Sequence, residues 1–177
     1  MTELDLTVLG VLARDGPMSA YDVRQVFARS VTPSWSSSSG SIYPAIRRLV
    51  EAGLASASAA EGARGRQTLQ TTPEGRRAVE QWVCDFAPGL AGATPDPLRT
   101  RAFFLALLTT EARQAFLRHA MESTDGAIVD AERIFAELSA RHDGSLDHLA
   151  SLGALYELRA RRAWLADVSR RLSPRPG

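Results

Sequence analysis

The side chains best suited to recognising another molecule gather in residues 36–54, SSSSGSIYPAIRRLVEAGL. Four hydroxyl groups and one guanidinium stand close together there: Ser38, Ser39, Ser41, Tyr43 and Arg47. Hydroxyls and the free N–H groups of a helix start suit phosphate oxygens, whereas arginine can also donate two hydrogen bonds to guanine. These residue types favour contact with a nucleic acid. The alternative is that Tyr43 packs in a core and the serines form a plain loop.

A short amphipathic helix is expected to present these groups. Three apolar residues follow the i, i+4, i+7 spacing of one buried stripe: Ile42, Ile46 and Leu49. At 100° per residue, Tyr43 and Arg47 then fall on or beside the opposite face. Pro44 is expected in the first helical turn, where no intrahelical N–H bond is lost. Gly53 followed by the apolar Leu54 is typical of a helix C-terminus, so the helix should end there.

Composition narrows the classes of function. All 21 basic residues are arginine, which excludes chemistry that needs a lysine, such as a P-loop or a Schiff base. The net charge is only +1, so binding to nucleic acid would depend on charge placement, and no acidic residue lies between Asp22 and Glu51. One cysteine and three scattered histidines argue against a disulfide framework or a metal site, and we expect no cofactor. Because no apolar run approaches the roughly 18 residues of a membrane span, we expect a cytoplasmic protein.

The order of elements around the central helix indicates a winged helix-turn-helix. Apolar periodicity predicts helices over residues 4–14 and 20–30 before it. After it, residues 54–58 and 67–71 could pair as two strands across a glycine-containing loop, although residues 56–60 could equally be loop. Thr72-Pro73-Glu74 then starts a helix that is expected to end near residue 86.

A proline- and glycine-rich segment divides the chain into residues 1–88, a linker at 89–96, and residues 97–177. The second domain is expected to be helical, with helices over 97–108, from Thr110, and from Ser145. Seven residues repeat at alternating spacings of four and three, as in a coiled coil: Leu117, Met121, Thr124, Ile128, Ala131, Phe135 and Leu138. Such a seam is either plain core or part of a dimer interface. We favour a dimer because three helices have little surface to bury it.

Further candidate residues lie outside the central helix. Arg64 and Arg66, at the tip of the expected hairpin, would contact phosphate or the minor groove, with a solvated loop as the alternative. Cys84 is more typical of a small buried residue than of a redox sensor. A nucleophilic role is not expected either, since no histidine lies near it in sequence. Four aromatic residues could line an effector pocket between subunits or between the two domains, or could simply be core: Phe103, Phe104, Tyr156 and Trp164.

Several segments together resemble the PadR family of bacterial transcriptional regulators. They are LTVLGVLARDGPMSAYDV at 6–23, Trp35, SGSIYPAIRRLVEAGL at 39–54, TPEGRR at 72–77 and AWL at 163–165. The chain departs from the family pattern at Ala20, where a glycine commonly precedes the tyrosine, and at Leu69, where the second wing strand usually has an aromatic residue.

This resemblance implies a mainly α (α+β) fold, with an N-terminal winged helix-turn-helix and a C-terminal helical dimerisation domain. It also implies a function: a homodimeric repressor, not an enzyme, that binds an inverted-repeat operator in double-stranded DNA and is released by a small aromatic or lipophilic effector. The alternative is a winged helix that binds another protein and has no specificity for DNA.

Overall fold

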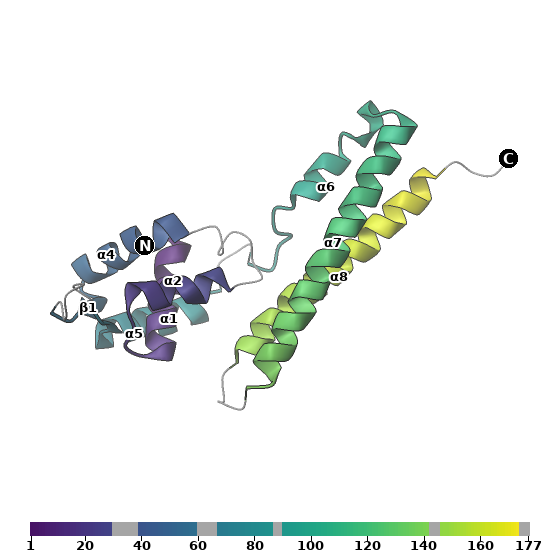
Figure 1. The fold of residues 1–177 in the computed structure, drawn as a ribbon. Helices are drawn as coiled ribbons and strands as arrows, with labels where there is room; N and C mark the ends of the chain where they lie inside the picture. Colours follow the sequence, from purple (N-terminus) through teal and green to yellow (C-terminus); the bar gives the residue numbers. More distant parts are fainter. Residues whose placement is uncertain (30–38, 60–66, 87–89, 142–145, 174–177) are drawn as a thin grey trace. The chain divides into compact units, whose positions relative to one another are not determined.

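The chain forms two compact units, Met1–Gly92 and Ala93–Gly177. The structure, a computed structural model, describes residues 1–29, 39–59, 67–86, 90–141 and 146–173 (Figure 1). The division between the units falls inside the proline- and glycine-rich segment at 89–96.

The described residues of the N-terminal unit form four helices: α1 (Glu3–Asp15), α2 (Ala20–Ala28), α4 (Ser39–Glu51) and α5 (Pro73–Cys84). Two of them begin with a capping box, in which the side chains of Thr2 and Asp5, or of Ser19 and Asp22, each accept from the other residue's backbone N–H. The predicted helices 4–14 and 20–30 are thus confirmed, with ends that differ by one or two residues. Thr72 caps α5, and the predicted proline at its first position is present.

The wing is a two-stranded antiparallel hairpin of β1 (Ala55–Ala57) and β2 (Leu69–Thr71). Ser56 lies opposite Gln70, and Met18 forms an isolated bridge with Leu69 on the other side of β2. The predicted hairpin is therefore correct, although both strands are shorter than expected. Leu69 is 4% exposed, so an aliphatic side chain fills the place of the family's aromatic residue.

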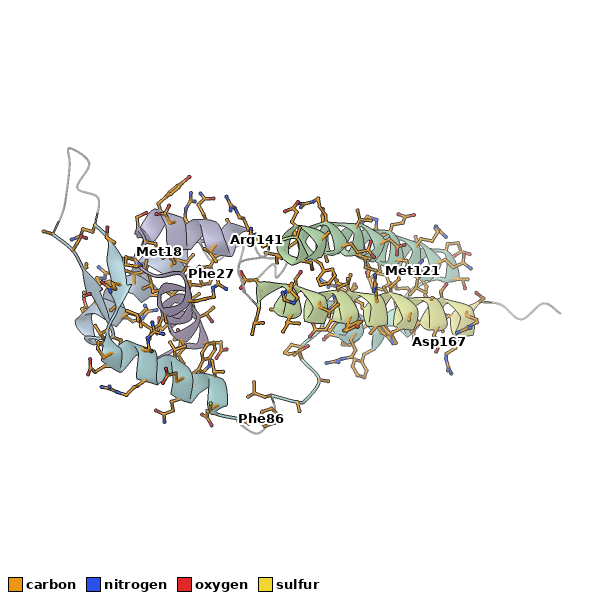
Figure 2. All side chains as sticks on the ribbon, turned by 90° about the horizontal axis from the view of Figure 1, so that it is seen from below. Met18, Phe27, Phe86, Met121, Arg141 and Asp167 are labelled. Atoms are coloured by element: carbon orange, nitrogen blue, oxygen red, sulfur yellow. The ribbon has the colours of Figure 1, made fainter. Side chains whose placement is uncertain are left out.

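One apolar core holds the helices of the N-terminal unit against the wing. Its buried members come from α1, α2, α4, β1 and β2: Val8, Leu9, Val11, Leu12, Val23, Phe27, Ile42, Ala45, Ile46, Leu49, Ala55 and Leu69. Burying a leucine- or isoleucine-sized side chain contributes about 1.5–3 kcal/mol, so this set is the main source of the unit's stability. Figure 2 labels Met18 and Phe27, which lie in this unit before and within α2.

The C-terminal unit consists of α6 (Pro97–Ala102), a 3₁₀ turn η1 (Leu105–Leu107), α7 (Thr110–Ser139) and α8 (Asp147–Leu172). The prediction of one helix over 97–108 was wrong, because α6 ends at Ala102. Breaking the helix lets Leu105 turn inward, where it is 6% exposed beside Leu117 and Leu165. Arg113 of α7 donates to the carbonyls of Leu105 and Leu108, at 3.1 and 3.2 Å, and so holds η1 against α7.

Helices α7 and α8 run side by side as a long antiparallel pair (Figure 1). All seven residues of the predicted seam are buried or half-buried, and Leu117, Thr124 and Ala131 are at most 4% exposed. Salt bridges flank the pair: Arg159 contacts Glu132 and Arg162 contacts Asp125, both at 2.7 Å. The seam is therefore at least in part the contact between these two helices, which Figure 2 shows side by side with Met121 and Asp167 labelled.

Candidate nucleic-acid interface

Helix α4 has one buried and one exposed face, as the apolar spacing predicted. Ile42, Ala45, Ile46 and Leu49 are at most 7% exposed. On the other face Tyr43 is 50% exposed, and Ser41 and Arg47 are also exposed. Arg47 forms no ion pair with any residue that the structure describes. The helix therefore offers an uncommitted guanidinium and a phenol to an external partner.

The start of α4 carries positive electrostatic character. Its first turn contains no acidic residue, and Gly40 and Ser41 are exposed there. Unpaired N–H groups and the helix macrodipole give such an end a partial positive charge of about half an elementary charge. Anions, including phosphate groups, are stabilised at this kind of terminus.

Pro44 does not lie in the first turn, contrary to the prediction. Because α4 begins at Ser39, Pro44 is inside the helix. Its ring nitrogen has no hydrogen to donate to the carbonyl of Gly40, one turn earlier. The prediction failed because it placed the helix start too late.

The other end of α4 follows the predicted glycine stop. Gly53 has φ +70°, a conformation that residues with a Cβ rarely adopt. The N–H of Leu54 donates to Leu49 O at 2.9 Å, and the N–H of Gly53 donates to Val50 O at 3.0 Å. These two bonds define a Schellman motif, which ends the helix and leads the chain directly into β1.

Arg48, the neighbour of Arg47, forms an ion pair within the unit. Its guanidinium donates to the carboxylate of Asp5, which is 2% exposed. Burial alone would raise the pKa of Asp5, but the hydrogen bonds from Arg48 and Thr2 outweigh it and hold that pKa below its usual value. The same contact raises the pKa of Arg48. Asp5 is therefore ionised at neutral pH and binds Arg48 to α1.

An open hollow of about 910 Å³ adjoins the exposed face of α4. Its walls come from the first turn of α2, from α4 and from the wing: Ser19, Ala20, Tyr21, Asp22, Tyr43, Ile46, Arg47, Val50, Glu51, Ala57, Gln67 and Leu69. α2, α4 and the wing therefore present side chains around one concave surface that includes Tyr43 and Arg47.

Sequence reasoning missed Tyr21, which lines this surface, and its neighbour Arg24. Tyr21 is 55% exposed at the start of α2, and the Arg24 guanidinium carbon lies 5.4 Å from the centre of its ring. This is a cation–π contact, which stiffens both side chains. The available signal was that Tyr21 stands outside the apolar stripe of its helix, which Val23 and Phe27 form.

Four of the predicted DNA-contacting residues have no described side chain. Ser38, Arg64 and Arg66 lie outside the described residues, and Ser39 is described only as the first residue of α4.

The four predicted effector residues do not converge on one pocket within the described part of the C-terminal unit. Phe104 lines a small apolar hollow of about 200 Å³ together with Leu105, Leu108 and Phe116. Trp164 is half-buried and packs on the core around Leu165. Phe103 and Tyr156 are 81% and 62% exposed, and Tyr156 lies about 12 Å from Trp164 along the axis of α8, at 1.5 Å per residue.

Other kinds of site find little support in the part of the chain that the structure describes. No three His, Cys, Asp or Glu side chains there gather closely enough to hold a metal ion. None of the described helices is both long enough and apolar enough to cross a membrane. Cys84 is exposed and free, so the expectation of a buried cysteine was wrong: it lies at the last residue of α5, where the helix has left the core.

Comparison with known proteins agrees with this arrangement. Residues 8–81 match the model of the Transcriptional regulator PadR-like family. Negative transcriptional regulator PadR of Bacillus subtilis (strain 168) is 22% identical over 142 residues, which cover 79% of this chain and 77% of that protein.

Two solved structures of Bacillus subtilis PadR share the fold. The complex with operator DNA has a TM-score of 0.82 at 20% identity and covers 97% of this chain and 100% of that one. The complex with p-coumaric acid has a TM-score of 0.77 at 20% identity and covers 96% of this chain and 94% of that one. Residues 8–81, which contain α4 and the wing, are therefore similar to the PadR-like family of transcriptional regulators.

Proposed function

We propose that this chain is a homodimeric transcriptional repressor that binds an inverted-repeat operator through α4 and is released by a small aromatic or lipophilic effector. The observation that carries the proposal is the outward face of α4. Tyr43 and Arg47, which has no ion-pair partner among the described residues, stand there beside a helix start without acidic residues.

Docking of α4 in the major groove explains this face. In a helix-turn-helix the second helix enters the groove and its N-terminal residues contact base edges. We expect Ser39, Ser41 and the first N–H groups of α4 to contact phosphate, and Arg47, two turns into the helix, to contact a base edge. Tyr21 and Arg24 extend the surface across α2, and the wing tip with Arg64 and Arg66 adds contacts to phosphate or the minor groove.

Dimerisation through the C-terminal unit is supported by the apolar side chains that it leaves exposed. They cluster around η1 and along α8: Phe103, Phe104, Leu107, Leu108, Leu146, Leu149, Tyr156 and Leu172. Neighbouring exposed apolar side chains, such as Phe103, Phe104, Leu107 and Leu108 around η1, mark an interaction site when they form a patch. A two-fold dimer binds an inverted repeat, so its two α4 helices would occupy successive major grooves about 10 base pairs apart.

Dimerisation is tested by equilibrium sedimentation of the full chain at micromolar concentration, which should give twice the mass of one chain. A single species with the mass of one chain would contradict it.

Repression and release by an effector are supported by the relatives. Negative transcriptional regulator PadR gives the direction of control, and its complex with p-coumaric acid gives the class of ligand. The hollow beside Phe104 holds about 200 Å³, less than the roughly 300–1,000 Å³ of typical ligand sites. We therefore place the effector site where a second copy of the chain completes the walls that Phe103, Phe104, Tyr156 and Trp164 begin.

Binding isotherms with fluorescent duplex DNA over a series of salt concentrations test the DNA-binding function. Affinity should fall steeply and log-linearly as salt rises, because each phosphate contact releases counterions. Affinity that is undetectable at low salt would contradict the proposal and favour a winged helix that binds protein. A matched experiment with p-coumaric acid and related phenolic acids tests release: operator affinity should fall at saturating ligand, and affinity unchanged across the panel would refute the effector.

A further inference from the structure

A buried carboxylate joins the first turn of α1 to the last turn of α4. Arg48 donates to Asp5 through both Nη2 and Nε, with Nε 3.2 Å from Oδ1. Asp5 Oδ2 also accepts the backbone N–H of Thr2 at 2.9 Å, so the carboxylate that holds Arg48 closes the capping box of α1 as well. The side chain of Asp5 is 3% exposed and that of Arg48 is 49% exposed.

This contact fixes the rotation of α4 about its own axis, which the apolar core alone does not. Apolar burial is non-directional, so the stripe of α4 tolerates small rotations of the helix about its axis. A guanidinium that donates two hydrogen bonds to one carboxylate has a defined geometry. Since consecutive helical residues lie about 100° apart, holding Arg48 against Asp5 also sets the direction in which Arg47 projects.

The same contact occupies one of the two edges of the Arg48 guanidinium that could otherwise bind DNA. Arginine recognises a phosphate or a guanine by two donors on one edge, and Nε and Nη2 of Arg48 are both directed at Asp5. Arg47, the preceding residue, has no such partner among the described residues. Two adjacent arginines on one helix therefore have different tasks.

We propose that Arg48 and Asp5 form a positioning pair that orients the DNA-binding face of α4, so that Arg48 supports sequence discrimination without contacting DNA. The inference rests on the proposed function, because it takes α4 as the helix that enters the major groove.

The test uses the full chain with Asp5→Asn, Arg48→Gln and the double variant. Affinities are measured for the duplex that the wild-type chain selects and for a scrambled duplex, over a salt series. A control, Glu74→Gln, removes an exposed ion pair of the same unit in which Arg77 contacts Glu74 at 2.6 Å. The ratio of the two affinities is the main readout, because loss of folded protein lowers both affinities equally and leaves the ratio unchanged.

The positioning role predicts that each single variant lowers this ratio about threefold to thirtyfold and that the double variant lowers it no further, as for two coupled residues. The slope of log affinity against log salt should stay at the wild-type value in Arg48→Gln. The control should leave both quantities unchanged. A slope reduced by about one unit in Arg48→Gln, with an unchanged ratio in Asp5→Asn, would instead make Arg48 a phosphate contact and overturn the inference.

Amide hydrogen exchange of the free protein separates failure of this inference from failure of the proposed function. Asp5→Asn should raise exchange in residues 42–49 of α4 relative to Glu74→Gln, whatever the chain binds. Faster exchange in a protein without sequence preference would reject the DNA-binding proposal alone. Exchange in α4 that equals the control would reject the positioning pair.

Discussion

At the scale of single residues, the division of labour between Arg47 and Arg48 is the feature that sequence could not supply. Two consecutive arginines on a helix look equivalent in sequence, and the spacing of Ile42, Ile46 and Leu49 gives only their approximate direction. The partner that distinguishes them, Asp5, lies 43 positions earlier in the chain. Tyr21 and Arg24 were missed for a similar reason, since only folding brings the first turn of α2 beside α4.

Arg47→Ala is the residue-level prediction for recognition. Loss of one contact to a base edge should weaken binding to the operator by about 1–3 kcal/mol and relax preference at one position of each half-site. Binding to scrambled DNA should change much less. Equilibrium titrations with operator variants at that position check this, and equal weakening on operator and scrambled duplexes would show that Arg47 contacts only phosphate.

Gly75 supplies a residue-level prediction for stability. A Cβ added there would collide with the backbone carbonyl of Leu54, at the junction of the wing and α5. Because a backbone group cannot move aside easily, Gly75→Ala should lower the free energy of unfolding by about 1–3 kcal/mol.

The matched control for this variant is Gly126→Ala in α7, where an added Cβ would meet no atom within 4 Å. It should raise stability by about 0.5–1 kcal/mol, since glycine is a poor residue inside a helix. Urea unfolding of both variants decides the matter. Equal effects would mean that Gly75 is not required by close packing.

At the scale of elements, the sequence predicted correctly those features that depend on residues close together in the chain. Residue types at fixed spacing predicted three of these features: the end of α4 at Gly53, the start of α5 at Thr72 and the seam of α7. The prediction of one helix over 97–108 was wrong because tertiary contacts favour a break after Ala102. These contacts are the burial of Leu105 and the hydrogen bond that Arg113 donates to its carbonyl. The hairpin was predicted from element order, since its alanine-rich strands have little intrinsic preference for a sheet.

Two carboxylates that hold elements in place predict how the protein responds to acid. Burial would raise the pKa of Asp96, as for Asp5, but hydrogen bonds from Arg161 and from the N–H groups of Arg99 and Leu98 hold it below its usual value. A lowered folded-state pKa contributes stability above the unfolded value of about 3.9 and loses it as pH falls through the folded value.

Asp5→Asn and Asp96→Asn should therefore lower the melting temperature most at neutral pH. Their difference from wild type should shrink as pH falls from about 4 toward the folded-state pKa, where the wild-type carboxylates become protonated too. Thermal unfolding monitored by circular dichroism at pH 7, 4, 3 and 2 measures this. A difference that stays constant across this range would mean that the charge of these carboxylates does not stabilise the fold.

The wing tip is predicted to bind differently from α4. Arg64 and Arg66 stand in the glycine-containing connection between β1 and β2, where holding a base-specific geometry is difficult. Replacing both with alanine should weaken binding to operator and to scrambled DNA nearly alike and reduce the salt slope by roughly one unit per lost phosphate contact. Selective loss of operator binding would instead assign sequence recognition to the wing.

At the scale of the whole molecule, the protein consists of two units, to which we assign separate tasks. The N-terminal unit presents α4, the first turn of α2 and the wing on one concave surface. The C-terminal unit buries its seam between α7 and α8 yet still exposes apolar side chains around η1 and along α8. A second copy of the chain would cover that surface and place a second α4 on the same DNA.

Selection of bound duplexes from a random pool with the purified full chain tests whether two copies of α4 bind one inverted repeat. A two-fold dimer should enrich a single inverted repeat whose half-sites have centres roughly 10 base pairs apart, or a multiple of one helical turn. A selected pool indistinguishable from the starting pool, or one enriched in a single asymmetric site, would contradict it.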